Sequence, residues 1–231
     1  MKHWIAAAAA ALALAACTPP AEEPSPPADA PNVQIPSADY TLDPNHSTVT
    51  VRALHFGLSH YTLRFNAVSG TLHFNAEDPA QSSVEATVDV ATLDTPYSGD
   101  RDFDAELQNS DWLNSADFPQ ATFTSTSVEQ TGPRTARVTG DLSFKGQTHP
   151  VTLDVTYNTS HRQHPLGPQV SMIGFSARGT IARSQYGVNN LMASAGATDG
   201  VADDVELIIE AEFTRPLETG TPSTVPPEPV N

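Results

Sequence analysis

The stretch that decides the fold runs from residue 138 to residue 157 and reads VTGDLSFKGQTHPVTLDVTY. Before the Lys145-Gly146 pair the apolar residues occupy even-numbered positions, and after it they occupy odd-numbered positions from Val151 to Tyr157. Most of the residues between them are polar. Because side chains on a strand alternate between its two faces, this pattern predicts two strands, each with one apolar face. Gly146 supplies the positive φ angle of a tight hairpin turn. Pro150 lacks an N–H group, so we expect it at a strand start or a bulge.

The same alternation recurs along most of the chain and predicts an all-β fold. The expected strands cover residues 48–55, 63–75, 84–90, 122–128, 138–144, 151–157, 170–183 and 205–213. Within the second of these, the Ser69-Gly70 pair indicates a bulge or bend. Eight antiparallel strands with one apolar face each form either a barrel or a sandwich, and both enclose an interior.

One interruption has helical rather than strand spacing. Residues 98–114 read SGDRDFDAELQNSDWLN, which predicts a short helix between the third and fourth strands, with Ser98 as its N-cap. Arg101 and Asp102, at its start, form a structural ion pair, cap the helix, or contact a ligand. Residues 185–200 form a second irregular piece, which we interpret as a lid or rim loop.

The N-terminus has the form of a bacterial export signal. Residues 1–16 begin with Lys2 and continue into an apolar run that is too short to span a bilayer, which predicts a secretory signal peptide. The run ends Leu14-Ala15-Ala16-Cys17, which resembles the lipobox of bacterial lipoproteins; this implies cleavage before Cys17 and a lipid on its thiol. The alternative is a plain signal peptide with a chance cysteine. Thr18 after the cysteine implies, by the same resemblance, the periplasmic side of the outer membrane.

Composition separates a folded unit from its two ends. Residues 17–36 and 217–231 are rich in Pro and small residues and predict a disordered tether and a disordered tail around a domain at 37–216. The chain carries a net charge of −16. Such acidity argues against nucleic acid as a partner and against electrostatic docking on anionic lipid. The simpler interpretation is that acidity keeps the protein in solution.

The sequence contains no recognisable catalytic motif. It lacks G-x-S-x-G, H-E-x-x-H and a glycine-rich phosphate loop. His161 and His164 lie three apart in a predicted loop without a third ligand, so we predict neither a metal site nor an enzyme. His55 shares parity with Val49 and Val51 and is expected to point inward. A buried imidazole needs a hydrogen-bond partner, either nearby backbone or the polar head of a ligand.

Several short motifs, in this order, resemble the YceI-like family. They are Tyr40-Thr41-Leu42-Asp43, His46-Ser47, His55-Phe56-Gly57-Leu58-Ser59, Arg64-Phe65-Asn66, Arg101-Asp102, Asp111-Trp112-Leu113, Phe118-Pro119-Gln120-Ala121-Thr122-Phe123-Thr124-Ser125-Thr126, Thr139-Gly140-Asp141-Leu142, Gly146, Pro150-Val151-Thr152-Leu153 and Arg183-Ser184-Gln185-Tyr186-Gly187-Val188. The resemblance covers residues 39–215. The chain departs from the pattern at Leu63, where a glycine commonly stands, and at His60.

The resemblance implies an eight-stranded antiparallel lipocalin-like barrel that encloses a polyisoprenoid chain. It also implies a periplasmic or secreted protein with no established catalytic activity. The ligand would be a polyisoprenoid lipid or an isoprenoid quinone, with no other cofactor. The residues expected to line the lumen are His55, Phe65, Leu72, Phe74, Val88, Phe123, Leu142, Phe144, Leu153, Val155, Phe175 and Leu207. Two alternatives stay open: an envelope stress protein whose barrel is filled by side chains, and an enzyme that uses His55. An exposed edge on an incompletely closed barrel would support a homodimer.

Overall fold

A computed structural model describes residues 33 and 35–217. The predicted signal peptide, Cys17, most of the predicted tether and all but the first residue of the predicted tail lie outside the described residues. Val33 and Ile35 pack in the core, and Ile35 is only 3% exposed. Tyr40 donates a hydrogen bond to the carbonyl of Pro36 at 3.0 Å. The packed unit therefore begins a few residues before Ser37.

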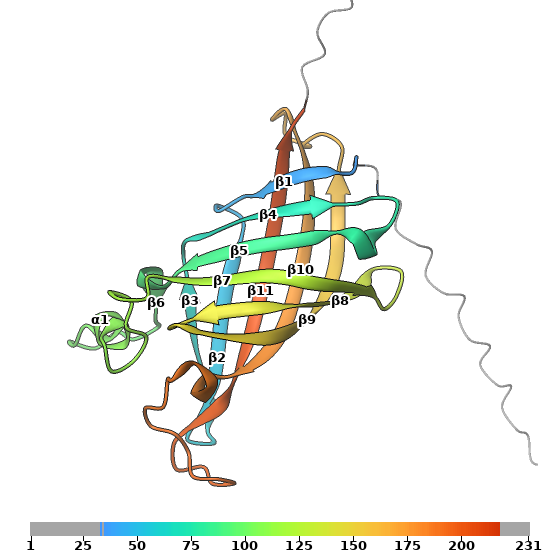
Figure 1. Cartoon of the computed structure of the whole chain (residues 1–231). Helices are drawn as coiled ribbons and strands as arrows, with labels where there is room; N and C mark the ends of the chain where they lie inside the picture. The colour runs from blue at the N-terminus through green and yellow to red at the C-terminus, as the bar shows by residue number, and fades with distance from the viewer. Residues whose placement is uncertain (1–32, 34, 218–231) are drawn as a thin grey trace, which may run out of the picture.

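The described chain consists mainly of strands, joined by loops that include a few short helical turns (Figure 1). The strands are β1 (Ala38–Leu42), β2 (Thr48–His55), β3 (Ser59–Phe65), β4 (Val68–Phe74), β5 (Ser83–Asp89), β6 (Leu93–Asp94), β7 (Gln120–Gln130), β8 (Thr135–Phe144), β9 (Gln147–His161), β10 (Val170–Ala182) and β11 (Val201–Pro216). The helical elements are η1 (Pro79–Gln81), η2 (Val90–Thr92), α1 (Phe103–Gln108) and η3 (Arg183–Tyr186).

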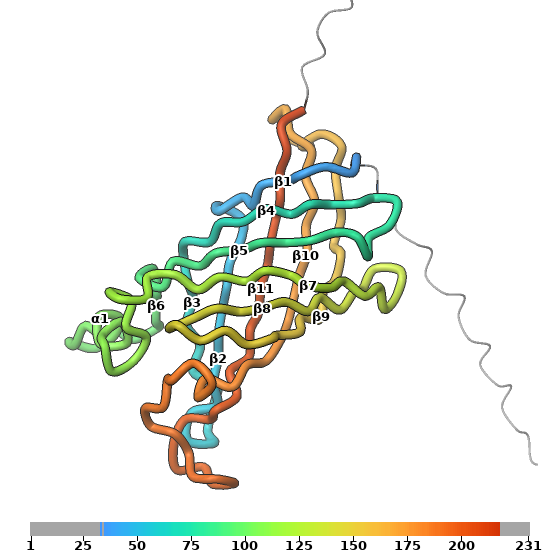
Figure 2. The backbone as a smooth tube through the Cα atoms, in the orientation of Figure 1, coloured from blue at the N-terminus to red at the C-terminus, as the bar shows by residue number. Residues whose placement is uncertain are grey.

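Eight of the strands close into an antiparallel barrel, which confirms the predicted fold class. The order is β1-β4-β5-β7-β8-β9-β10-β11, and β1 pairs again with β11 to close the ring. The remaining strands, β2, β3 and β6, extend from the other part of β11. In Figures 1 and 2, β1, β4, β5, β7 and β8 cross steeply over β2, β10 and β11, so two strand layers face each other.

The hairpin at 138–157 has the predicted form. Phe144 pairs with Gln147 around a two-residue turn, in which Lys145 and Gly146 have φ angles of 47° and 72°. Positive φ at both central residues matches the twist of the flanking strands. The expectation for Pro150 was wrong, because Pro150 is the fourth residue of β9. The pairing of β9 with β10 begins only at Asp154, so the missing N–H leaves no gap in that ladder.

The predicted strand 63–75 is two strands, and its break lies elsewhere than expected. The corner falls at Asn66 and Ala67, whose N–H groups both donate to the Thr92 hydroxyl, at 3.1 and 3.0 Å. Gly70 instead lies inside β4, where a Cβ atom would stand 2.5 Å from the carbonyl oxygen of Glu85. The glycine allows β5 to approach closely rather than marking the bend.

The helix is shorter than predicted and has a different N-cap. It covers Phe103–Gln108, and the carboxylate of Asp102 accepts a hydrogen bond from the N–H of Ala105 at 3.0 Å. An Asp at this position is a preferred cap because its oxygen satisfies an otherwise unpaired donor. Ser98 lies outside the helix.

Candidate binding cavity

A cavity of about 740 Å³ lies between the two strand layers. Its wall consists mainly of the inward-facing apolar side chains of the strands, and the segment around α1 and the residues after η3 complete it. The volume falls within the range of about 300–1,000 Å³ typical of small-molecule sites. The barrel is therefore hollow, unlike the side-chain-filled alternative.

All twelve residues predicted to line the lumen do line this cavity. They are His55, Phe65, Leu72, Phe74, Val88, Phe123, Leu142, Phe144, Leu153, Val155, Phe175 and Leu207. Their parity was sufficient to place them, because alternate side chains of each barrel strand face inward. Their contact with a ligand stays a prediction.

His55 is half-buried at the end of β2 and contacts aromatic rings. Its ring centroid lies 4.6 Å from that of Phe56 and 6.2 Å from that of Tyr61. Within the described part of the chain, its ring nitrogens have no hydrogen-bond partner, so the expected backbone acceptor is not present. The imidazole is placed to meet a polar group that enters the cavity.

Several aromatic residues of the wall come from loops, and strand parity could not predict them. Tyr97 and Phe103 lie in or beside α1, with ring centroids 5.5 Å apart. The Arg101 guanidinium stacks over both, at 4.4 Å from the Phe103 centroid and 5.1 Å from that of Tyr97. Arg101 also lies 3.4 Å from the Glu106 carboxylate, so its ion pair is with Glu106 and not with Asp102. The helical spacing of the segment was the only signal available for these side chains.

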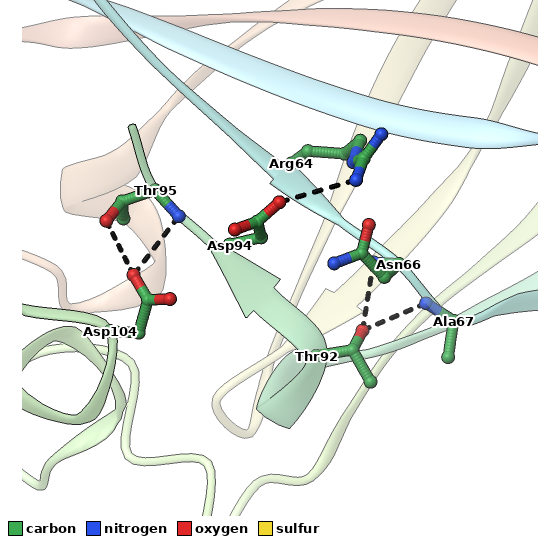
Figure 3. A network of polar contacts seen from close by, with 7 residues as sticks. All are labelled: Arg64, Asn66, Ala67, Thr92, Asp94, Thr95 and Asp104. Atoms are coloured by element: carbon green, nitrogen blue, oxygen red, sulfur yellow. Dashed lines mark hydrogen bonds and ion pairs between the residues drawn. The ribbon is translucent and has the colours of Figure 1, made fainter. Parts of the chain in front are cut away.

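Polar contacts attach the α1 segment to the barrel (Figure 3). Thr95 donates to the Asp104 carboxylate through its N–H at 3.1 Å and its hydroxyl at 2.5 Å. The Lys145 ammonium donates to the Trp112 carbonyl at 2.5 Å, and burial lowers the pKa of this lysine. Figure 3 shows the neighbouring network of Arg64, Asn66, Ala67, Thr92, Asp94, Thr95 and Asp104. These contacts hold the aromatic side chains of the segment over the cavity.

A buried arginine fixes the loop after η3. The Arg183 guanidinium, 7% exposed, donates to the carbonyl oxygens of Val188, Val201 and Ala202 at 2.8, 3.1 and 2.9 Å. Burial lowers its pKa, and the nearby Asp203 carboxylate acts in the opposite direction. Arg183 and Val188 both line the cavity, so this cation shapes the wall through backbone contacts.

Two tyrosine hydroxyls of the wall are buried without a hydrogen-bond partner in the described residues. They belong to Tyr61 on β3 and Tyr186 in η3. Burial raises the pKa of Tyr186. A buried hydroxyl without a partner is costly, so these atoms mark positions that a water or ligand oxygen would satisfy.

The described residues offer neither a metal cluster nor a membrane-spanning helix. No group of three or more His, Cys, Asp or Glu side chains in residues 33 and 35–217 is arranged to hold a metal ion. None of the helices in this part of the chain is long and apolar enough to cross a bilayer.

Comparison with known proteins settles the family. Residues 40–213 match the model of the YceI-like domain. The chain belongs to the YceI-like family. Protein YceI of Escherichia coli O157:H7 is 34% identical over 178 residues, which cover 76% of this chain and 86% of that protein. A protein of Pseudomonas fluorescens strain SBW25 is 33% identical over 168 residues, covering 72% of this chain and 84% of its own.

Solved structures share the YceI-like fold. BcnA of Burkholderia cenocepacia has a TM-score of 0.60 at 26% identity, over 74% of this chain and 98% of that one. A polyisoprenoid binding domain from Saccharophagus degradans has a TM-score of 0.55 at 13% identity, over 77% of this chain and 98% of that one. At this low identity, the second likeness shows the fold alone.

Proposed function

We propose that this protein binds a long apolar lipid, either a polyisoprenoid or an isoprenoid quinone, inside its barrel at the bacterial envelope. The cavity of about 740 Å³ with an almost wholly apolar wall carries the proposal. Membership of the YceI-like family supports it, as does the fold shared with a domain described as polyisoprenoid-binding. The role is binding for transport, storage or sensing rather than catalysis.

Hydrophobic burial supplies enough free energy for such binding. Removing a CH₂ group from water contributes about 0.8 kcal/mol, so one five-carbon isoprene unit contributes roughly 3–4 kcal/mol. A prenyl lipid begins in a bilayer that already buries it, and the net gain on entering the barrel is much smaller. A small net gain suits a carrier, which must release its ligand as well as bind it.

The proposal includes a periplasmic location with a lipid anchor on Cys17. This part rests on the sequence of residues 1–18, which reads as a lipoprotein signal followed by Thr18. At about 3.3 Å per extended residue, the sixteen steps from Cys17 to Val33 span at most about 50 Å. Such a tether would keep the barrel near the outer membrane while leaving its orientation open.

Extraction of the protein from its native envelope tests the proposal. Protein purified in mild detergent and extracted with organic solvent is expected to yield a prenyl lipid near one molecule per chain by mass spectrometry. A matched extract of an unrelated periplasmic lipoprotein controls for lipid carried by detergent. Equal prenyl content in the two extracts would overturn the proposal.

A further inference from the structure

Exposed apolar side chains gather at one end of the described molecule. The large hydrophobic residues with substantial exposure are Leu54, Phe56, Leu58, Tyr97, Leu166 and Leu191. Leu166 is the exception among them, because it lies in the β9–β10 loop at the start of β10, whereas η3 lies at the end of β10. Leu54 lies near the end of β2, and the others lie in the β2–β3 turn, in the segment after β6 and in the loop after η3. Leu58 is 84% exposed and Leu191 is 59% exposed.

The β2–β3 turn and the loop after η3 form one structural unit, which we name the apolar tip and define as residues 54–58 and 188–200. The Phe56 N–H donates to the Gly200 carbonyl at 2.8 Å. Gly57 lies so close to Thr198 that an added Cβ would stand 2.7 Å from the threonine Cβ. Figures 1 and 2 show the two segments side by side at the lower end of the barrel.

Two of the exposed side chains are held in an unfavourable backbone conformation. Phe56 has a φ angle of 50° and Leu191 one of 51°. Bulky residues rarely adopt this left-handed region, and surrounding contacts must impose it. Neither side chain is buried in the core, so core packing does not account for their identity. The tip presents apolar groups outward at a cost in backbone strain.

The apolar tip is continuous with the wall of the cavity. Leu191 and Val188 of the tip line the cavity, and so does His55 of the β2–β3 turn. Tyr97, exposed beside this end, also belongs to the wall. An apolar molecule leaving the cavity at this end would pass directly along the exposed side chains.

The tip carries a single formal charge, the exposed carboxylate of Asp199, in a strongly acidic chain. Residues 53–63 and 184–198 contain no Asp, Glu, Lys or Arg, whereas the whole chain carries a net charge of −16. A surface with one charged side chain loses little ion hydration when it contacts a bilayer. The acidic remainder of the protein repels anionic headgroups. The surface therefore fits a bilayer whose lipids carry no net charge.

We propose that the apolar tip docks on a bilayer of net-neutral lipid, so that the end of the cavity lined by Val188 and Leu191 faces the membrane. Phe56, Leu58 and Leu191 would enter the interfacial region. The proposal deepens the proposed function, because it names the surface through which the lipid ligand would exchange. A tether of about 50 Å would let this end of the barrel reach the bilayer that holds the anchor.

Vesicle flotation with matched leucine variants tests the docking. The chain from Thr18 onward keeps every described residue and lacks the acyl group, so binding reports on the tip. It is expected to float with phosphatidylcholine vesicles. Leu58→Ser should lower the partition coefficient about tenfold, the value of one leucine side chain moved out of an apolar environment. Leu166→Ser changes an equally exposed leucine, at 88%, and should leave the coefficient unchanged.

Other outcomes would overturn the docking without deciding the proposed function. Absence of flotation, equal loss in both leucine variants, or stronger binding to phosphatidylglycerol vesicles at low salt would each contradict it. A dimer in light scattering that Leu58→Ser dissociates, without vesicle binding, would assign the tip to self-association instead. Prenyl lipid in the envelope extract together with failed flotation would leave the proposed function standing. Flotation without prenyl lipid in the envelope extract would support the docking and contradict the proposed function.

Discussion

Arg183 is a buried cation that faces backbone carbonyls. Its three partners lie 5 to 19 residues further along the chain, where the loop after η3 returns to β11. The residue belongs to a motif that resembles the YceI-like family, yet the hydrogen bonds by which it holds the loop in place could not be predicted. The sequence does not indicate which carbonyl groups a distant loop will present to a guanidinium.

Asp43 and His46 form an exposed ion pair that makes stability depend on pH. The imidazole lies 2.8 Å from the carboxylate. The hydrogen bond with His46 lowers the pKa of Asp43 below 3.8, and that with Asp43 raises the pKa of His46 above 6.5. Because its pKa is raised in the fold, His46 stabilises the protein below pH 6.5 and loses this effect as pH rises through its folded pKa. Because its pKa is lowered in the fold, Asp43 stabilises the protein above pH 3.8 and loses this effect as pH falls through its folded pKa.

His46→Gln should therefore lower the thermal midpoint most between about pH 4 and pH 6.5, and progressively less as pH rises through the raised pKa of His46. Thermal unfolding of both proteins across this range measures the difference. His161→Gln serves as control, because the exposed His161 has no carboxylate partner in the described residues. A difference that grows with rising pH would show that His46 acts in another way.

The buried hydroxyl of Tyr186 predicts an unusual response to substitution. The residue is 1% exposed, and its ring packs near Phe144 and His149. Tyr186→Phe keeps the ring and removes a polar atom that has no partner in the described residues. We expect the free energy of unfolding to stay equal or to rise by up to about 1 kcal/mol. Urea denaturation measures it, and a loss of 1 kcal/mol or more would show that the hydroxyl has a partner.

At the scale of elements, alternation predicted strands well and their bends poorly. The hairpin of β8 and β9 was predictable because its turn residues and its parity agree. The corner at Asn66 and Ala67 was not, because the hydroxyl that fixes it belongs to Thr92, about 25 residues away in sequence. β1 was missed because its five residues carry only a short alternation. Pairing partners distant in sequence decide such features.

Gly140 shows how closely β7 and β8 approach. A Cβ atom at this position would lie 2.5 Å from both the Thr124 carbonyl oxygen and the Phe123 ring. Because backbone must move to admit it, Gly140→Ala is expected to cost about 1–3 kcal/mol of stability. Gly174→Ala is the matched control in β10, since its nearest atoms lie 4.0 Å from the added Cβ. Chemical denaturation compares them, and equal stability of the two variants would contradict the close approach.

At the scale of the whole molecule, the alternation of apolar residues predicted which side chains face inward. It did not predict that they leave a cavity between them. Inward-facing side chains can meet across a barrel or leave a space, and the distance between the layers decides which. The loops also contribute, through Tyr97, Trp112 and Leu191. Their place follows from contacts such as that between Lys145 and Trp112, which no local pattern indicates. The volume of the cavity therefore could not be predicted from the sequence.

The cavity itself can be tested by filling it. Ala121 on β7 lines the cavity, whereas Thr124 on the same strand is exposed and lies outside it. Ala121→Phe places an aromatic ring where the lipid would lie, and Thr124→Phe adds the same ring to the outer surface. Excluding two methylene groups of a ligand costs about 1.6 kcal/mol, so Ala121→Phe should weaken binding more than tenfold.

Trp112 supplies the measurement, because it lines the cavity and is the sole tryptophan of the chain from Thr18 onward. Decylubiquinone, a short isoprenoid-quinone analogue that quenches tryptophan fluorescence, is titrated into the three proteins. Saturable quenching is expected in the unchanged chain and in Thr124→Phe, with the midpoint shifted to higher concentration in Ala121→Phe. Equal midpoints in all three would place the quinone outside the barrel. Thermal unfolding checks that each variant is folded, since filling a space that holds no side chain should leave the core packing intact.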